Sequence, residues 1–325
     1  MRMPAEWAPH ERTIMCWPAR HDLYGPHFEA AKAEHAAVAN AIAAFEPVTL
    51  AAHPSQVDEA RAAVTGGVDV VPIPIDDAWA RDSGPIFVTG GDGARSGVHF
   101  GFNAWGEKFH PHDQDAAFGE RVLDHLGEQV VDATDFILEG GSIAVDGEGT
   151  LVTTEQCLLH PKRNPSLDRE GIEARLRQHL GADRVVWLGQ GLVEDLDTDG
   201  HVDNICAFVA PGHVLLQTVD AEDDPNFANC AENARRLRAA GLTVTELPVL
   251  PRLADVEEPT VVPYVNYYVA NGALIVPVTG AETDDEVLQK LEQLYPGREA
   301  VPVSGSTLAI GGGGVHCITQ QVPVA

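Results

Sequence analysis

Three carboxylates in the sequence stand next to apolar runs, where a charge is costly to keep. They are Asp82, Glu139 and Asp203. A carboxylate that is buried without a partner costs several kcal/mol, so three of them together indicate a cationic ligand. Guanidinium is planar and carries N–H groups along its edges, which makes it the cation that best matches paired carboxylates.

A cysteine and a histidine complete this candidate set. Cys317 follows the glycines 311–314, which allow a ligand to approach the backbone closely. His201 precedes Asp203 by two residues, and residues two apart on an extended strand face the same way. We expect Cys317 as a nucleophile and His201 as its base; a buried core thiol and a structural histidine–carboxylate pair are the alternatives. Strand alternation points His316 to the opposite face, so we do not expect it to be the base.

Two tryptophans and an arginine lie close to these residues in the sequence. Trp79 and Trp105 are suited to stacking on a flat cation or on its alkyl chain, with ordinary core tryptophans as the alternative. Arg81 is expected to form an ion pair with its neighbour Asp82. The sequence contains no phosphate-binding glycine motif, no H-E-x-x-H and no C-x-x-C, so it predicts neither a nucleotide cofactor nor a metal ion.

The elements that would position these residues alternate along the chain. Apolar periodicity predicts six helices, each followed by a short β-rich run, and this alternation indicates an α/β architecture. The helical windows are His27–Glu46, Ser55–Thr65, Gln114–Leu126, Ser166–Leu180, Pro225–Ala240 and Asp284–Leu294.

Five Gly- and Asp-rich turns recur between these runs, at intervals of roughly 60 residues with a shorter last interval. They begin at Asp82, Gly140, Asp199, Tyr264 and Gly311. A repeat that holds a helix and several strands favours blades arranged about an axis, which would bring the polar loops to one mouth. A two-domain α/β protein is the alternative. No Pro/Gly/Ser-rich linker divides the chain, so we expect one domain over residues 1–325.

Composition excludes several classes of function. The 325 residues include 21 Lys+Arg and 49 Asp+Glu, which gives a formal net charge of −28, and 44% of them are hydrophobic. Such a chain is typical of a globular protein with a sizeable core. Its negative charge repels phosphate and attracts small cations, so we expect no nucleic-acid partner. Acidic surfaces also serve solubility alone.

The sequence also bears on location. The first residues lack the apolar region of a signal peptide, and no stretch reaches the roughly 18 apolar residues of a membrane helix. The chain has only four lysines and therefore no polybasic membrane patch. Five cysteines, an odd number, favour reduced thiols. We expect a cytoplasmic protein with no membrane partner, and the sequence leaves open whether it forms a homo-oligomer.

Taken together, these motifs closely resemble those of agmatine deiminases (agmatine iminohydrolases), guanidine-modifying enzymes related to the bacterial peptidylarginine deiminases. The resemblance extends nearly from end to end and rests on MPAEWAPHERT, DDAWARDSGP, FNAWGEKF, LEGGSIAVDGEGTLVTTEQCLL, DTDGHVDN, YVNYYVANG and GGGGVHCITQQVP. It implies a five-bladed pseudosymmetric α/β propeller, the pentein fold.

The resemblance also implies roles for individual residues. Cys317 would be the nucleophile, His201 the catalytic histidine, and Glu139 the acid that orients it. Asp82 and Asp203 would bind the guanidinium group. The further residues expected to contact the substrate are Trp79, Trp105 and Asp199.

The implied reaction is the hydrolysis of agmatine to N-carbamoylputrescine and ammonia through a covalent amidino-cysteine intermediate, without a cofactor or metal ion. Deimination of arginine or peptidylarginine, or amidinotransfer, are the alternatives on the same scaffold. A guanidine- or polyamine-binding protein is the non-enzymatic alternative. Cys317 and His201 argue against it, because binding alone needs only carboxylates.

Overall fold

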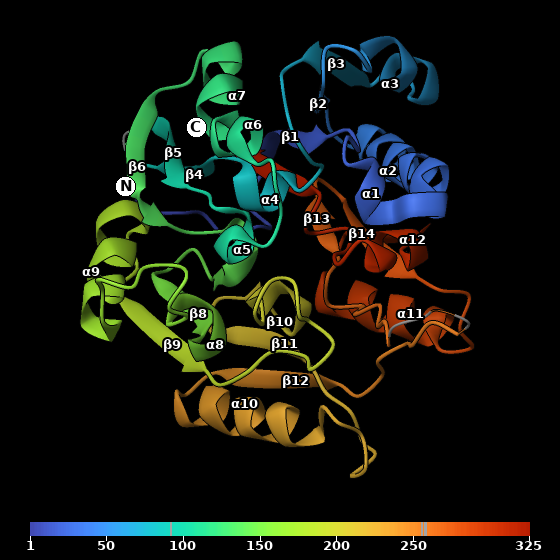
Figure 1. Cartoon of the computed structure of the whole chain (residues 1–325). Helices are drawn as coiled ribbons and strands as arrows, with labels where there is room; N and C mark the ends of the chain where they lie inside the picture. Colours follow the sequence, from blue (N-terminus) through green and yellow to red (C-terminus); the bar gives the residue numbers. More distant parts are fainter. Residues whose placement is uncertain (92, 255, 257–258) are drawn as a thin grey trace.

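The computed structural model describes residues 1–91, 93–254, 256 and 259–325. Within these residues the strands form five separate sheets. Figure 1 shows the sheets following one another in chain order around the middle of the molecule, as the blades of a propeller do. Over the described part of the chain, no helix has the length and apolar character that crossing a membrane requires.

Four blades repeat one three-stranded plan. Two strands form an antiparallel hairpin, and a third strand follows a helix and pairs parallel with the second. The strands of these blades are β4 (Ile86–Thr89), β5 (Arg95–Gly101) and β6 (Val130–Ile137), then β7 (Ile143–Val145), β8 (Thr150–Thr154) and β9 (Arg184–Leu188), then β10 (Cys206–Ala210), β11 (His213–Gln217) and β12 (Thr243–Leu247), then β13 (Tyr268–Ala270), β14 (Ala273–Val278) and β15 (Glu299–Ser304).

The remaining blade joins the first and last strands of the chain. Its order is β16-β1-β2-β3. Strand β1 pairs antiparallel with β16 and parallel with β2, and β2 pairs parallel with β3. The bounds are β1 (His10–Cys16), β2 (Val48–Ala52), β3 (Val68–Pro72) and β16 (Thr319–Pro323). This pairing closes the ring.

Each predicted helical window contains a helix, so the predicted α/β alternation is confirmed. The long helices are α2 (Phe28–Ala43), α3 (Val57–Ala63), α7 (Phe118–Leu126), α9 (Arg169–Leu180), α10 (Phe227–Ala239) and α11 (Asp284–Leu294). Short turns of helix cluster in the connections: α1 (His21–Tyr24), η1 (Gly25–His27), α4 (Ala80–Ser83), α5 (Ala104–Glu107), α6 (Asp113–Ala116), η2 (Gly140–Ser142), α8 (Glu155–Leu158), η3 (Val202–Asn204) and α12 (Ser306–Ile310).

Two local predictions of extended strand are wrong. His201 lies at the start of the 3-10 turn η3, which contains Asp203. His316 and Cys317 lie in a turn, and strand β16 begins only at Thr319. The side-chain directions at these positions are therefore set by turns and not by strand alternation.

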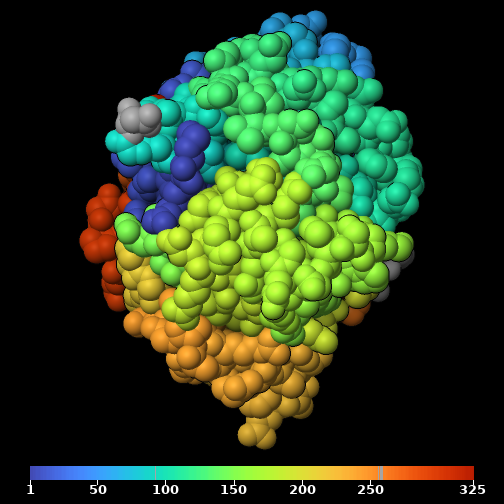
Figure 2. All heavy atoms as spheres, turned by 90° about the vertical axis from the view of Figure 1, so that its left-hand side faces the viewer, coloured from blue at the N-terminus to red at the C-terminus, as the bar shows by residue number. Residues whose placement is uncertain are grey.

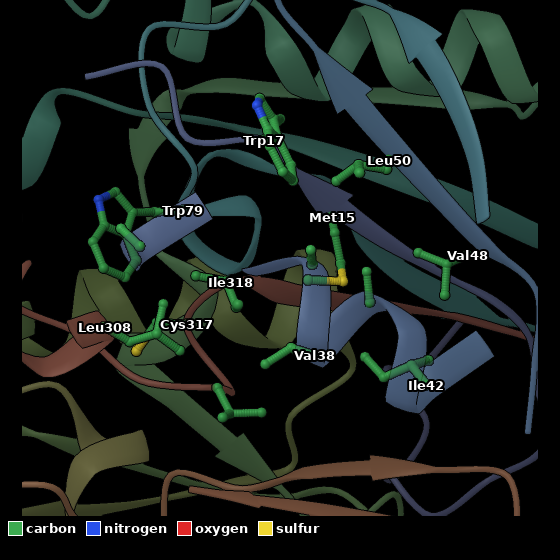
Figure 3. Close-up of a cluster of buried hydrophobic side chains, with 14 of the residues drawn as sticks. Met15, Trp17, Val38, Ile42, Val48, Leu50, Trp79, Leu308, Cys317 and Ile318 are labelled. Carbon is green, nitrogen blue, oxygen red and sulfur yellow. The ribbon is translucent and has the colours of Figure 1, made fainter. Parts of the chain in front are cut away.

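One apolar cluster packs the first blade against the last and supports the candidate nucleophile. It includes Met15, Ile42 and Leu50 and extends to Cys317. Figure 3 shows Cys317 at the edge of this cluster, near Leu308. The thiol is therefore held on a close-packed part of the core, where its position is well defined.

Candidate active site

Each of the five connections between successive blades delivers polar side chains to one place. In chain order these are Asp82, Glu139, His201 with Asp203, Asn266 and Cys317. All six are buried, and none is more than 5% exposed. Five of them are the predicted catalytic residues, which the structure brings together. The sixth, Asn266, is a residue that the sequence-based prediction missed.

Asp82 lies in α4 and is fixed through both of its carboxylate oxygens. Oδ1 accepts a hydrogen bond from the backbone amide of Gly141 at 2.9 Å, and Oδ2 accepts one from Nε1 of Trp105 at 2.9 Å. Burial raises the pKa of Asp82, and the charges of Asp203 and Glu139 add to this rise while His201 opposes it. The carboxylate is thus held in place, and no lysine or arginine side chain pairs with it among the described residues.

Asp203 has one engaged oxygen and one open oxygen. Oδ2 lies 2.8 Å from Nδ1 of His316 and accepts the Cys317 thiol at 3.5 Å. Oδ1 is buried and has no hydrogen-bond partner among the described residues. Burial alone would raise the pKa of Asp203, but the hydrogen bond and charge of His316 outweigh it and lower the pKa. The lowered pKa favours the ionised form of Asp203, whose Oδ2 lies beside the Cys317 thiol.

His201 is completely buried, and its ring has no hydrogen-bond partner among the described residues. Its Nδ1 lies 3.8 Å from Oδ2 of Asp82. The backbone is anchored, because the amide of His201 donates to Oδ2 of Asp195 at 3.1 Å and to the Thr198 hydroxyl at 3.1 Å. The backbone of His201 is thus fixed, while its imidazole ring is available to a reacting group.

Cys317 is the candidate nucleophile, and Asn266 lies against it. Nδ2 of Asn266 donates to the sulfur at 3.4 Å, and its Oδ1 accepts from the backbone amide of His316 at 3.0 Å. Burial raises the pKa of the Cys317 thiol well above its ordinary value, and the charges of Asp203 and Asp82 raise it further. The resting thiol is therefore protonated, and a cation bound between the carboxylates would favour its ionisation.

The glycine run before Cys317 makes room for the site's own side chains. A Cβ atom on Gly314 would lie 2.3 Å from Oδ1 of Asn266, and one on Gly313 would lie 2.4 Å from the ring of Trp79. We expected these glycines to admit a ligand. Gly311, Gly312 and Gly313 also line the pocket described below, whereas Gly314 packs against Asn266 and does not line it.

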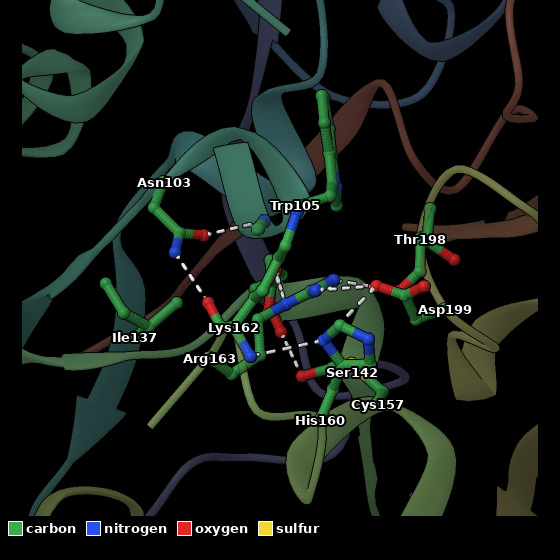
Figure 4. Close-up of polar contacts among 12 residues, drawn as sticks. Asn103, Trp105, Ile137, Ser142, Cys157, His160, Lys162, Arg163, Thr198 and Asp199 are labelled. Carbon is green, nitrogen blue, oxygen red and sulfur yellow. Dashed lines mark hydrogen bonds and ion pairs between the residues drawn. The ribbon is translucent and has the colours of Figure 1, made fainter. Parts of the chain in front are cut away.

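Glu139 is neutralised by an arginine that the sequence-based prediction missed. Nε of Arg163 donates to Oε1 of Glu139 at 2.6 Å, and both side chains are fully buried. The same guanidinium donates to Oδ2 of Asp199 at 2.7 Å and to the carbonyl of Thr198 at 2.9 Å (Figure 4). Lys108 donates to the other oxygen of Asp199 at 2.8 Å. Asp199, predicted to contact the substrate, is thus engaged in ion pairs and is absent from the pocket lining.

One group of side chains has the composition of a metal site. Ligand atoms of Glu139, Cys157 and His201 lie within 4.8 Å of one another. The Arg163 guanidinium already provides a permanent positive charge beside this group. Burial alone would lower the pKa of Arg163, but the neighbouring carboxylates of Glu139 and Asp199 outweigh burial and raise it. A second cation there would be repelled, so the donor set does not favour a metal ion.

Cys317 lines a pocket of about 320 Å³, a volume that includes its solvent-open mouth. Its lining consists of Leu23, Asp77, Trp79, Asp82, Trp105, Phe109, Asp197, Thr198, Gly311, Gly312, Gly313 and Cys317. Trp79 and Trp105 meet edge to face, with ring centroids 6.5 Å apart. Both tryptophans thus lie on the wall of a pocket that carries three carboxylates, and their contact with the substrate stays a prediction.

The prediction for Arg81 is wrong. Its side chain donates to Oε1 of Gln321 at 2.8 Å and to the carbonyl of His316 at 3.3 Å, and no hydrogen bond or ion pair joins it to Asp82 among the described residues. The side chain therefore points away from the pocket. Its backbone amide donates to the carbonyl of Cys317 at 3.1 Å, which fixes α4 beside the nucleophile.

Comparison with known proteins agrees with this geometry. Residues 2–323 match the family described as Porphyromonas-type peptidyl-arginine deiminase. The chain is 43% identical to agmatine deiminases of Pseudomonas fluorescens and Pseudomonas aeruginosa, with 99% of this chain and 95% of each relative covered.

Solved structures agree as well. The agmatine deiminase of Enterococcus faecalis superposes with a TM-score of 0.95 at 32% identity, covering 99% of this chain and 96% of that one. A substrate-bound agmatine deiminase of C. jejuni has a TM-score of 0.92 at 27% identity, with the same coverage. The fold is the predicted five-bladed pentein propeller, and the chain belongs to the Porphyromonas-type peptidyl-arginine deiminase family.

Proposed function

We propose that the protein is an agmatine deiminase, a hydrolase that converts agmatine and water to N-carbamoylputrescine and ammonia. The observation that carries this proposal is the convergence of two carboxylates, Asp82 and Asp203, on the buried thiol of Cys317 and the unpartnered imidazole of His201. Relatives that bear this name are 43% identical over 99% of the chain.

The guanidinium group of agmatine is held by charge and shape. Asp203 offers the carboxylate that lies beside the Cys317 thiol to the N–H edge of the cation, and Asp82 offers a carboxylate already oriented by Gly141 and Trp105. Trp79 and Trp105 flank the butyl chain. Binding of the cation offsets the two buried carboxylates and places the guanidinium carbon next to the sulfur.

In the first half of the reaction, Cys317 adds to the guanidinium carbon. The bound cation lowers the cost of forming the thiolate, which burial and the two aspartates otherwise raise. His201 accepts the proton of the thiol as the C–S bond forms and delivers it to the departing nitrogen, and the C–N bond then breaks to release ammonia. An amidino-cysteine remains on the enzyme.

In the second half, water replaces ammonia beside His201. The imidazole accepts a proton from this water as the oxygen attacks the amidino carbon. The C–S bond then breaks, the thiolate of Cys317 leaves and is reprotonated, and the carbamoyl product departs. Glu139, held by Arg163 at 2.6 Å, has a carboxylate oxygen within 4.8 Å of a ring nitrogen of His201 and orients the imidazole.

The pocket favours agmatine over arginine. Its described lining carries Asp77, Asp82 and Asp197 and includes neither lysine nor arginine. The nearby Nζ of Lys108 is engaged by the carbonyls of Leu196 and Asp197 and by Asp199, all at 2.8 Å. An α-carboxylate would meet repulsion and desolvation there, each on the order of 1–3 kcal/mol, which together correspond to about 10²-fold discrimination or more.

We further propose that residues 1–325 act as one catalytic domain, because all five blade connections contribute to the site. Hydrolysis by this arrangement draws only on side chains and water and calls for no cofactor. A cytoplasmic location is supported by five cysteines that are all free thiols, as is typical of reducing compartments.

Ammonia release, measured side by side on agmatine, free arginine and a peptidyl arginine, tests the proposal. We expect kcat/KM for agmatine to exceed that for arginine by about 10²-fold or more. A preference for either arginine substrate would replace agmatine with that substrate. Binding without any ammonia release would favour the guanidine-binding alternative.

A further inference from the structure

A chain of charges lies behind Asp203, on the side away from the pocket. Nδ1 of His316 is 2.8 Å from Oδ2 of Asp203, and its Nε2 is 2.9 Å from Oε2 of Glu6. Both partners are carboxylates, which accept hydrogen bonds and do not donate them when ionised. Only an imidazolium, with a proton on each nitrogen, satisfies both contacts. The geometry therefore makes His316 a cation held between two anions.

The N-terminal segment places Glu6 in this chain. Its Oε1 accepts from the backbone amide of Val269 at 3.1 Å. The segment is anchored on two neighbouring blades, because Arg2 bridges to Thr89 and the amide of Met3 donates to the carbonyl of Leu180 at 3.0 Å. Figure 2 shows these first residues, in dark blue, lying on the surface between the cyan and the yellow-green parts of the chain. Glu6 is thus a fixed group.

The surrounding charges agree with this arrangement. Burial opposes ionisation of Glu6, but the charge and hydrogen bond of His316, helped by Arg81, lower its pKa to about 2. Burial and Arg81 act against the proton on His316, and Glu6 and Asp203 outweigh them and raise its pKa. The phenols whose pKa values the charge of Glu6 raises, together with burial, are neutral; they are those of Tyr267, Tyr268 and Tyr295.

The groups around Asp203 either favour or oppose the negative charge of its carboxylate. His316, His201 and Arg81 favour its charge, whereas Asp82 and burial oppose it. His316 is the one of these that donates to Asp203 directly among the described residues. Nδ1 of His316 and the thiol of Cys317, at 3.5 Å, both contact Oδ2 of Asp203, so the cation and the nucleophile meet at one carboxylate oxygen.

We propose that His316 and Glu6 are positioning residues that hold Asp203 ionised beside the Cys317 thiol. The inference rests on the proposed deiminase function and deepens it. Adjacent residues of one turn then serve the same carboxylate from opposite sides, Cys317 from the pocket and His316 from behind. The N-terminal segment, through Glu6, becomes part of the catalytic apparatus without touching the substrate.

The test is the pH profile of kcat/KM for ammonia release from agmatine. His316→Asn keeps a side-chain N–H near Asp203 but removes the positive charge. Glu6→Gln removes the negative charge behind His316, and Glu6→Asp keeps it. Glu11→Gln is the matched control, because it removes a carboxylate of the adjoining strand that pairs with Arg95 and does not face Asp203.

We expect His316→Asn to move the acid-side midpoint of the profile upward by about 1–3 pH units, because Asp203 then titrates without its cation. The loss of kcat/KM is therefore tenfold or more on the acid side and shrinks as the pH rises. Glu6→Gln shifts the midpoint in the same direction by a smaller amount, Glu6→Asp restores it, and Glu11→Gln leaves it in place.

Agmatine affinity gives a second reading that needs no turnover. In a Cys317→Ala background, calorimetry should show weaker binding for His316→Asn at low pH, with recovery at high pH. The inference would be overturned if agmatine affinity fell equally at every pH, or if neither His316→Asn nor Glu6→Gln shifted the pH profile of kcat/KM. In either case, turnover of agmatine by the wild-type protein would leave the proposed function intact. If His316→Asn does not fold, the comparison of Glu6→Gln with Glu6→Asp decides. An inactive wild-type protein would overturn the proposed function itself.

Discussion

One added methyl group at Gly141 should disable the site while leaving the fold intact. Gly141 lies in η2, and its backbone conformation is accessible to alanine. A Cβ atom there would lie 2.7 Å from Nδ1 of His201 and 2.9 Å from carboxylate oxygens of both Asp203 and Asp82. Ordinary contact begins at about 3.4 Å, so the methyl intrudes by about 0.7, 0.5 and 0.5 Å on three groups at once.

These three groups cannot all give way and keep their geometry. A displacement near 1 Å of a catalytic group costs on the order of 10²-fold in rate, which corresponds to about 2.7 kcal/mol of transition-state stabilisation. We therefore expect Gly141→Ala to lower kcat/KM for agmatine by about 10²-fold or more. The measurement is steady-state ammonia release beside a thermal unfolding curve.

Gly66→Ala is the matched control. Gly66 has no atom within 4 Å of the added Cβ and no positive φ, so the substitution should leave activity unchanged and add at most about 0.4–1 kcal/mol of stability. Gly141→Ala activity within threefold of wild type would refute the reasoning, because it would mean that the three side chains are not held where the structure places them.

Further predictions concern the thiol and the buried ion pair. Cys317→Ala and Cys317→Ser should abolish turnover while sparing agmatine binding, and mass spectrometry of the wild type should trap an adduct on Cys317; an adduct on Cys157 would contradict the assignment. Alkylation of Cys317 by a neutral reagent should keep accelerating beyond about pH 9, since burial and the two aspartates raise its pKa, and a plateau below neutrality would contradict this. Arg163→Met should cost about 3–5 kcal/mol of unfolding free energy by leaving Glu139 unpaired, with partial recovery when Glu139→Gln is added, and a cost below 1 kcal/mol would exclude that role. Dialysis against a chelator should leave activity intact, because Arg163 already occupies the cationic position beside Glu139 and His201.

The α/β alternation could be predicted because its signals are local and repeated, whereas the closed five-bladed ring followed only from the family resemblance. Each of the six helical windows and each recurring turn can be recognised from a few neighbouring residues, and every blade of the ring repeats these elements. The same repeat also held the signal that would have found Asn266. Its turn, which begins at Tyr264, was the only one of the five with no chemical residue assigned to it, although the other four each had one.

Pairing partners could not be predicted, because they come from distant parts of the chain. Asp199 was expected to meet the substrate, yet Arg163 and Lys108 hold it. Arg81 was expected to pair with its neighbour, yet its partner Gln321 lies 240 residues away. The sequence shows which residues are charged but not which residues pair with them. The ion-pair partner of each carboxylate is determined only when the chain folds into the ring.

The closing strand has a consequence for how the protein acquires activity. Strand β16 joins β1 across nearly the whole chain, and Cys317 lies two residues before it. The sulfur reaches Asp203 and Asn266 only when this last pairing is in place. Contacts so distant in sequence form late, after local helices and hairpins. During refolding, ammonia release therefore reports completion of the ring itself, whereas circular dichroism reports the earlier gain of helix and strand, and the lag between the two signals measures the closure step.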